Sequence, residues 1–200
     1  MAYYIIVLIV IGGIVFYLTS CKNKQNSKQT DDYVSKSGDT VKVHTLPDNR
    51  FLDLRSIAFN VTPEQLKLLL PADQTKVFGV VMDWDLGDGT MTLATYQTGD
   101  ASMYLSSGGG VIGGGQHENV SKASKEFVSM AQNYVDKSSK ADTTTLPDKN
   151  CLKFYFLTNK GKFVAQETID NIENNTSKWL GLFENANKVI TELRLTTEKK

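Results

Sequence analysis

The chain has 200 residues, and its 22 basic and 22 acidic side chains leave a formal net charge of zero. This balance supplies no basic stripe to neutralise phosphates, so nucleic acid is not an expected partner. Aromatic residues make up 10% of the chain, which is typical of a packed domain and excludes a largely disordered protein.

The chain begins with an apolar run, YYIIVLIVIGGIVFYL, at residues 3–18. A helix needs about 20 apolar residues to cross a bilayer, and residues 2–20 contain no charged side chain. Tyrosines near both ends of the run suit the interface between lipid and water. We therefore expect residues 1–20 to attach the protein to a membrane.

Two interpretations of this run place the protein on opposite sides of the membrane. Three lysines within residues 22–28 follow the run and no Lys or Arg precedes it, which predicts a signal anchor with a cytoplasmic domain. Alternatively, the sequence LTSC at residues 18–21 resembles a bacterial lipobox. That resemblance implies a lipoprotein with a lipidated Cys21, facing outside the cytoplasmic membrane. The long run and the missing basic start depart from the lipoprotein pattern.

Residues 21–40 are polar and should form a flexible tether, because they cannot bury enough apolar surface to offset the entropy of ordering. The remaining residues 41–200 should form one α+β domain. Its first predicted helix has Thr62 as N-cap and Gln65 completing a capping box, and it ends before Pro71.

Three strands are predicted next, at residues 77–84, 90–97 and 101–106. Tight-turn signals at Asp88-Gly89 and Gly99-Asp100 make them an antiparallel meander.

An amphipathic helix over 119–136, a hairpin of residues 152–158 and 163–166, and a final helix over 177–194 follow. The predicted fold is a five-stranded, mainly antiparallel sheet, built from the meander and the hairpin and covered by helices. Profilin-like and roadblock-like domains resemble this layout in topology alone.

A glycine-rich loop at residues 107–117 is the sharpest feature of the predicted domain, with six glycines among residues 108–115. Such a cluster indicates positive φ angles or a close approach of another group. It leads into a helix N-terminus, which favours anions, although a tight structural crossing or a flap is the alternative role. The candidate ligand-binding residues are Ser107, Gly108, Gly109, Gly110, Gly113, Gly114, Gly115 and His117.

His117 is also the candidate general base, because its intrinsic pKa of about 6.5 lies near neutrality; a capping or exposed histidine is the alternative. Asp83, Asp85 and Asp88 gather around the first hairpin and are candidate ligands for a divalent cation. Acidic residues of this kind also serve as ordinary turn residues. No cofactor motif is present, so no cofactor is expected.

The segment from about residue 77 to 134 resembles an uncharacterised bacterial domain family. The resemblance rests on the strand VFGVVMDW, the acidic hairpin after it, and the loop SGGGVIGGGQHENV. It implies a bacterial source and no particular activity.

Two functional hypotheses follow. The first is a membrane-tethered binding module whose contact surface is the loop 107–117, with an unknown protein or a small anionic ligand as partner. The second is a hydrolase acting on a small anionic or phosphorylated substrate. In that enzyme the loop would hold the anion, His117 would be the base, and Asp83 or Asp85 would bind a metal.

Overall fold

The computed structural model describes residues 50–198. The predicted membrane segment (residues 1–20), the tether (residues 21–40), Cys21 and the first residues of the predicted domain lie outside this range. No helix within residues 50–198 is both long and apolar enough to cross a membrane.

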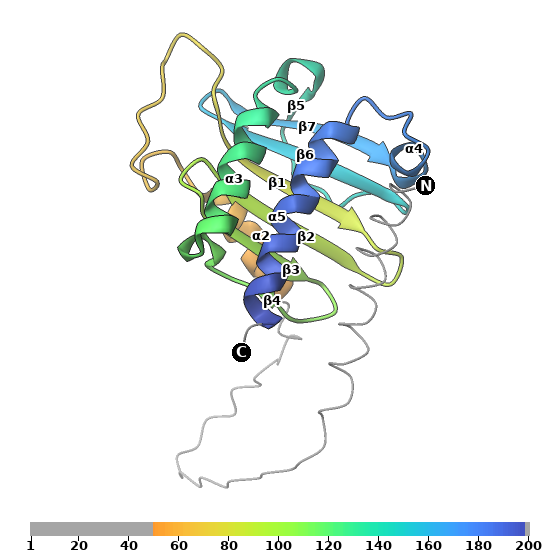
Figure 1. Ribbon diagram of the computed structural model, residues 1–200. Coiled ribbons are helices and arrows are strands. Elements are labelled where there is room, and N and C mark those ends of the chain that lie inside the picture. Colours follow the sequence, from red (N-terminus) through yellow and green to blue (C-terminus); the bar gives the residue numbers. More distant parts are fainter. Residues whose placement is uncertain (1–49, 199–200) are drawn as a thin grey trace, which may run out of the picture. The chain divides into compact units, whose positions relative to one another are not determined.

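The α+β class is confirmed, but within residues 50–198 the sheet has seven strands instead of the predicted five. Two short strands, β4 (Gly110–Val111) and β5 (Ser139–Ala141), extend the two edges, and neither shows the alternating or apolar pattern that reveals a strand. The order is β4-β3-β2-β1-β6-β7-β5, with every neighbouring pair antiparallel (Figure 1). The strands are β1 (Val77–Asp85), β2 (Thr90–Tyr96), β3 (Ala101–Leu105), β4 (Gly110–Val111), β5 (Ser139–Ala141), β6 (Cys151–Thr158) and β7 (Gly161–Thr168).

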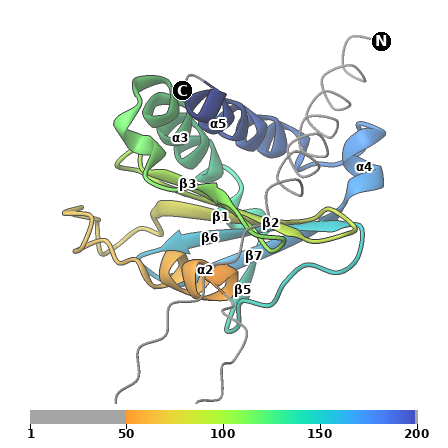
Figure 2. The same cartoon turned by 90° about the horizontal axis from the view of Figure 1, so that it is seen from below.

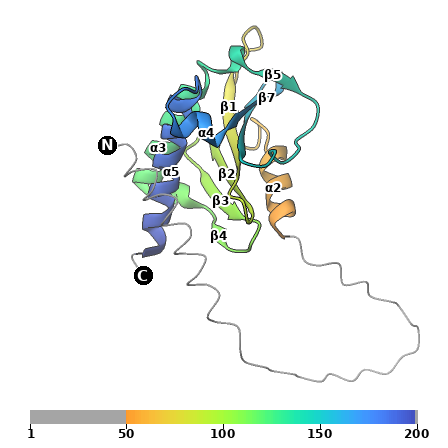
Figure 3. The same cartoon turned by 90° about the vertical axis from the view of Figure 1, so that its right-hand side faces the viewer.

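Helices lie on both faces of this sheet. Figures 2 and 3 show α3 and α5 together on one face and α2 on the other. The helices are α2 (Arg50–Asn60), α3 (Glu118–Ala131), α4 (Ile169–Glu173) and α5 (Leu180–Glu198), with 3-10 turns η1 (Gly114–Gln116) and η2 (Val135–Lys137).

Strand β1 lies at the centre and is buried on both sides, which explains why its sequence is mostly apolar. Trp84 meets Phe183 of α5 edge to face, with ring centroids 5.2 Å apart. On the other side, Val81 belongs to a cluster with Phe51 and Phe59 of α2. The sheet therefore separates two apolar layers.

The predicted helix at Thr62 is wrong, because no helix lies between α2 and β1. The capping box does form: the Thr62 N–H donates to Gln65 Oε1 (2.9 Å) and the Gln65 N–H donates to Thr62 Oγ1 (3.4 Å). However, residues 63–67 form a hydrogen-bonded turn and not a helix, and Lys67 has a φ of 56°, a left-handed conformation that does not continue a right-handed helix. The helix that covers this face is α2, which precedes the predicted one.

Three tyrosines on the α2 side provide a test of this packing. Tyr96 donates its hydroxyl to the Ala58 carbonyl oxygen (2.8 Å), and Tyr155 donates to that of Thr145 (2.6 Å). Burial raises the pKa of Tyr96, Tyr104 and Tyr155 above the ordinary value.

Because the folded pKa values are raised, the stability these hydroxyls contribute is complete below about pH 10 and is lost as the pH rises further. Absorbance at 295 nm should therefore show three tyrosines that ionise only as the protein unfolds. Ionisation of every tyrosine near pH 10 in a chain with an unchanged circular dichroism spectrum would contradict this packing.

Candidate functional site

The glycine-rich loop forms a hairpin at the edge of the sheet. The Leu105 N–H donates to the Gly109 carbonyl oxygen (3.2 Å), and the Gly108 N–H donates to that of Leu105 (3.0 Å). Strand β4 then pairs with β3, with Val111 opposite Met103. The chain reaches α3 through η1, so β4 lies between the turn and the helix.

Three glycines of this loop are required by their backbone conformation, and the space around them is open. Gly108, Gly109 and Gly113 have φ angles of 98°, 87° and 73°, which glycine adopts without steric cost. A Cβ atom at any of the three would meet nothing within 4 Å. The surface above these residues is therefore open to a partner.

The other three glycines of the loop are required by close contacts with the rest of the protein, which leave no room for a side chain. A Cβ atom on Gly110 would lie 2.2 Å from the Met103 carbonyl oxygen, and one on Gly115 would lie 2.8 Å from Asp100 Cα. At Gly114 it would lie 2.2 Å from Leu193 Cδ2, on α5. A side chain at any of these three positions would clash with the rest of the protein, although Gly110 itself is exposed, Gly115 is half-buried and only Gly114 is buried.

His117 lies at the N-cap of α3, exposed, and makes no side-chain capping bond. It borders a hollow of about 270 Å³ between the start of α3 and the end of α5. The lining residues include two carboxylates, Glu118 and Glu192, and among those described no Lys or Arg. This charge disfavours an anionic ligand beside His117.

Ile112 is the residue that the sequence reasoning did not single out. Its side chain is 67% exposed, in the middle of the loop. Residues 106–116 carry no charged side chain, so Ile112 lies on a neutral, glycine-lined surface. The sequence did contain an indication of this exposed residue, because Ile112 is a large apolar residue between glycines, and glycines have no side chains that could cover it.

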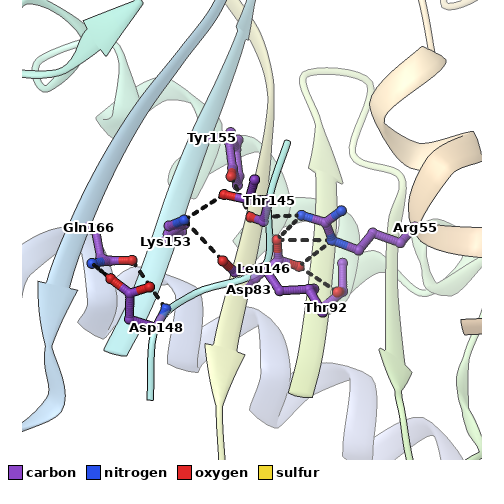
Figure 4. A network of polar contacts seen from close by, with 9 residues as sticks. All are labelled: Arg55, Asp83, Thr92, Thr145, Leu146, Asp148, Lys153, Tyr155 and Gln166. Carbon is purple, nitrogen blue, oxygen red and sulfur yellow. Dashed lines mark hydrogen bonds and ion pairs between the residues drawn. The ribbon is translucent and has the colours of Figure 1, made fainter. Parts of the chain in front are cut away.

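Asp83 does not lie in an open metal site. Its carboxylate is 0% exposed and accepts hydrogen bonds from Arg55 Nη2 (2.6 Å) and Nε (3.1 Å) and from Thr92 Oγ1 (2.5 Å), as Figure 4 shows. A buried carboxylate requires such partners, because desolvation without compensation is costly. The charge of Asp83 is thus committed to holding α2 on the sheet.

The neighbouring acidic residues have separate environments. Asp85 accepts a hydrogen bond from the Asn150 N–H (2.7 Å), and Asp88 is exposed in the β1–β2 turn. Among residues 50–198, no group of three or more His, Cys, Asp or Glu side chains is arranged to hold a metal ion.

The groups proposed for the hydrolase do not converge. Asp83 pairs with Arg55 of α2, whereas the hollow beside His117 is formed by α3 and α5. Figure 3 shows these helices on opposite sides of the sheet. A general base must reach its proton directly or through one water, so His117 and Asp83 cannot act on one substrate.

Arg55 is a structural residue that the sequence analysis missed. It lies among buried α2 residues at helical spacing, with Phe51, Ala58 and Phe59. Two features of the sequence indicated a buried ion pair. Arg55 occupies an otherwise apolar position of α2, and Asp83 lies inside a mostly apolar strand.

Polar contacts around this pair hold the segment 142–150 against the sheet (Figure 4). The Thr145 carbonyl oxygen accepts from Tyr155 Oη (2.6 Å) and from Arg55 Nη2 (3.3 Å). Lys153 Nζ donates to Thr145 Oγ1 (2.8 Å) and to the Leu146 carbonyl oxygen (3.0 Å). The polar groups around Arg55 and Asp83 find their hydrogen-bond partners within the protein, so this cluster has a structural role.

Comparison with protein-family models, with curated proteins and with solved structures finds no match to this chain. The resemblance to an uncharacterised bacterial domain family therefore stays a prediction from the sequence.

Proposed function

We propose that this chain is a binding module, tethered to a membrane by residues 1–20, whose contact surface is the loop 107–117. The observation that carries the proposal is Ile112, which is 67% exposed at the sheet edge. A single exposed apolar side chain is ordinary on a protein surface. Ile112 differs in lying beside glycine positions that are open and in a segment, residues 106–116, without charged side chains, and this combination supports contact with another protein.

The open positions of this loop support a protein partner over a small anion. Gly108, Gly109 and Gly113 leave the space around Ile112 free of side chains, which allows another backbone to approach closely. The nearby hollow carries Glu118 and Glu192, and like charge opposes an anionic ligand. A neutral surface with an exposed apolar side chain is better suited to protein contact than to an anion.

Site-specific photo-crosslinking in the producing cells tests this function. Benzoylphenylalanine placed at position 112 should give a discrete adduct in the membrane fraction after irradiation. The matched control is position 57, because Ile57 is similarly exposed at 63% but lies on α2, which covers a face of the sheet and not its β4 edge (Figure 3).

The proposal predicts an adduct from position 112 and none of the same mass from position 57. A photoreactive residue at 112 that yields only the uncrosslinked chain would contradict the proposal. The same set of bands from both positions would also contradict it, because that would show collisions without a specific surface.

A further inference from the structure

We infer that β4 pairs with β4 of a second copy of this chain, in antiparallel register across a two-fold axis. The inference rests on the proposed function and names the partner of the same loop. It would join two seven-stranded sheets edge to edge.

Among the strands of residues 50–198, β4 pairs with β3 on one side and with no strand on the other. The Gly109 carbonyl oxygen accepts from Leu105 (3.2 Å) and the Gly113 N–H donates to Ser102 Oγ (3.2 Å), so both turn toward β3. Polar groups of successive residues in an antiparallel strand point to alternate sides. The N–H and C=O groups of Gly110 and Ile112 therefore point outward from the sheet.

The two edges of the sheet differ in how well they are protected against pairing with a strand of another chain. Exposed charged side chains discourage the pairing of an edge strand with another chain. The edge at β5 has them: Lys140 is within the strand, and Lys137 and Asp142 flank it, all exposed. Residues 106–116 around β4 carry no charge, and this edge is left open to pairing.

A two-fold axis makes this edge complementary to itself. With Val111 facing its counterpart, Gly110 of one copy lies opposite Ile112 of the other, and the outward donors and acceptors of both meet. Each Ile112 side chain then covers a glycine that has no side chain. Two identical neutral surfaces also bring no like charges together.

A cysteine at position 111 tests this register in the full-length chain. Residues facing each other without mutual hydrogen bonds have Cα atoms about 4.5 Å apart, which is within the range that a disulfide spans. We would oxidise Cys21→Ala/Val111→Cys in membranes and compare it with Cys21→Ala/Ile57→Cys and with Cys21→Ala alone.

The inference predicts a disulfide-linked dimer from Val111→Cys and monomer from both controls. Adding Ile112→Pro removes the outward N–H of each copy, and so two hydrogen bonds of the dimer, which should lower the dimer fraction about tenfold. Adding Ile112→Ala, which keeps the N–H, should leave more dimer than Ile112→Pro.

Equal dimer from Val111→Cys and Ile57→Cys, or no dimer from Val111→Cys, would overturn the self-pairing. If Val111→Cys stays monomeric while position 112 photo-crosslinks to a different protein, self-pairing fails and the binding function stands. If Val111→Cys stays monomeric and position 112 gives no adduct, both fail.

Discussion

Replacing Asp83 with alanine is expected to lower the free energy of unfolding by about 3–5 kcal/mol, the cost of leaving one partner of a buried ion pair uncompensated. The guanidinium of Arg55 would remain buried without the carboxylate that accepts its Nε and Nη2 hydrogen bonds. Thr92 would also lose its acceptor. Urea unfolding of the purified chain, followed by circular dichroism, measures the effect.

Two further variants distinguish the stability lost with the ion pair from the stability lost when any charged side chain is removed. Asp88→Ala removes an exposed carboxylate from the adjacent turn and should change the free energy of unfolding by no more than about 0.5 kcal/mol. The combination Arg55→Met, Asp83→Leu and Thr92→Val removes all the paired groups together and should recover much of the loss. An Asp83→Ala protein as stable as Asp88→Ala would show that the pair does not hold α2 in place.

Gly110→Ala is expected to release β4 from β3 and to destabilise the protein by about 2 kcal/mol or more. Its φ of 150° suits glycine alone. In addition, the new Cβ atom would lie 2.2 Å from the Met103 carbonyl oxygen, a backbone atom that no side-chain rotation can move. Hydrogen exchange of the Val111 amide should become faster.

Gly109→Ala is the matched control for this substitution. Gly109 also has a positive φ, of 87°, but a Cβ atom there would meet nothing within 4 Å. The cost should be about 1 kcal/mol, from backbone strain alone, with β4 still paired. Equal losses of stability from the two variants would contradict the close approach of Gly110 to β3.

The central strands and two long helices could be predicted from the sequence because their patterns are local. Val77–Asp85 is a mostly apolar strand because both of its faces are buried. The glycine and aspartate turns delimit the meander, and apolar residues recur at helical spacing in α3 and α5.

The edges of the sheet could not be predicted in the same way. Gly110–Val111 and Ser139–Ala141 are strands only because neighbouring strands pair with them, and their own sequences have no strand pattern. Similarly, the Thr62 capping box formed but did not continue into a helix. In each case a tertiary contact or a single backbone angle overrides the local signal.

The candidate site was located only in part. Glycine clustering singled out the loop as a candidate, but it could not distinguish open positions such as Gly108 from tightly packed ones such as Gly110. The environment of Asp83 also depends on Arg55, 28 residues earlier in the chain, on a helix that the sequence analysis did not predict. Spacing along the sequence cannot reveal such a pair.

The mass of the species photo-crosslinked through position 112 is the most direct test of the loop as a contact surface. We predict a single adduct at twice the mass of the chain, formed in the membrane fraction and absent when the photoreactive residue is at position 57. A chain that stays uncrosslinked at position 112 would contradict the assignment of a contact surface to this loop.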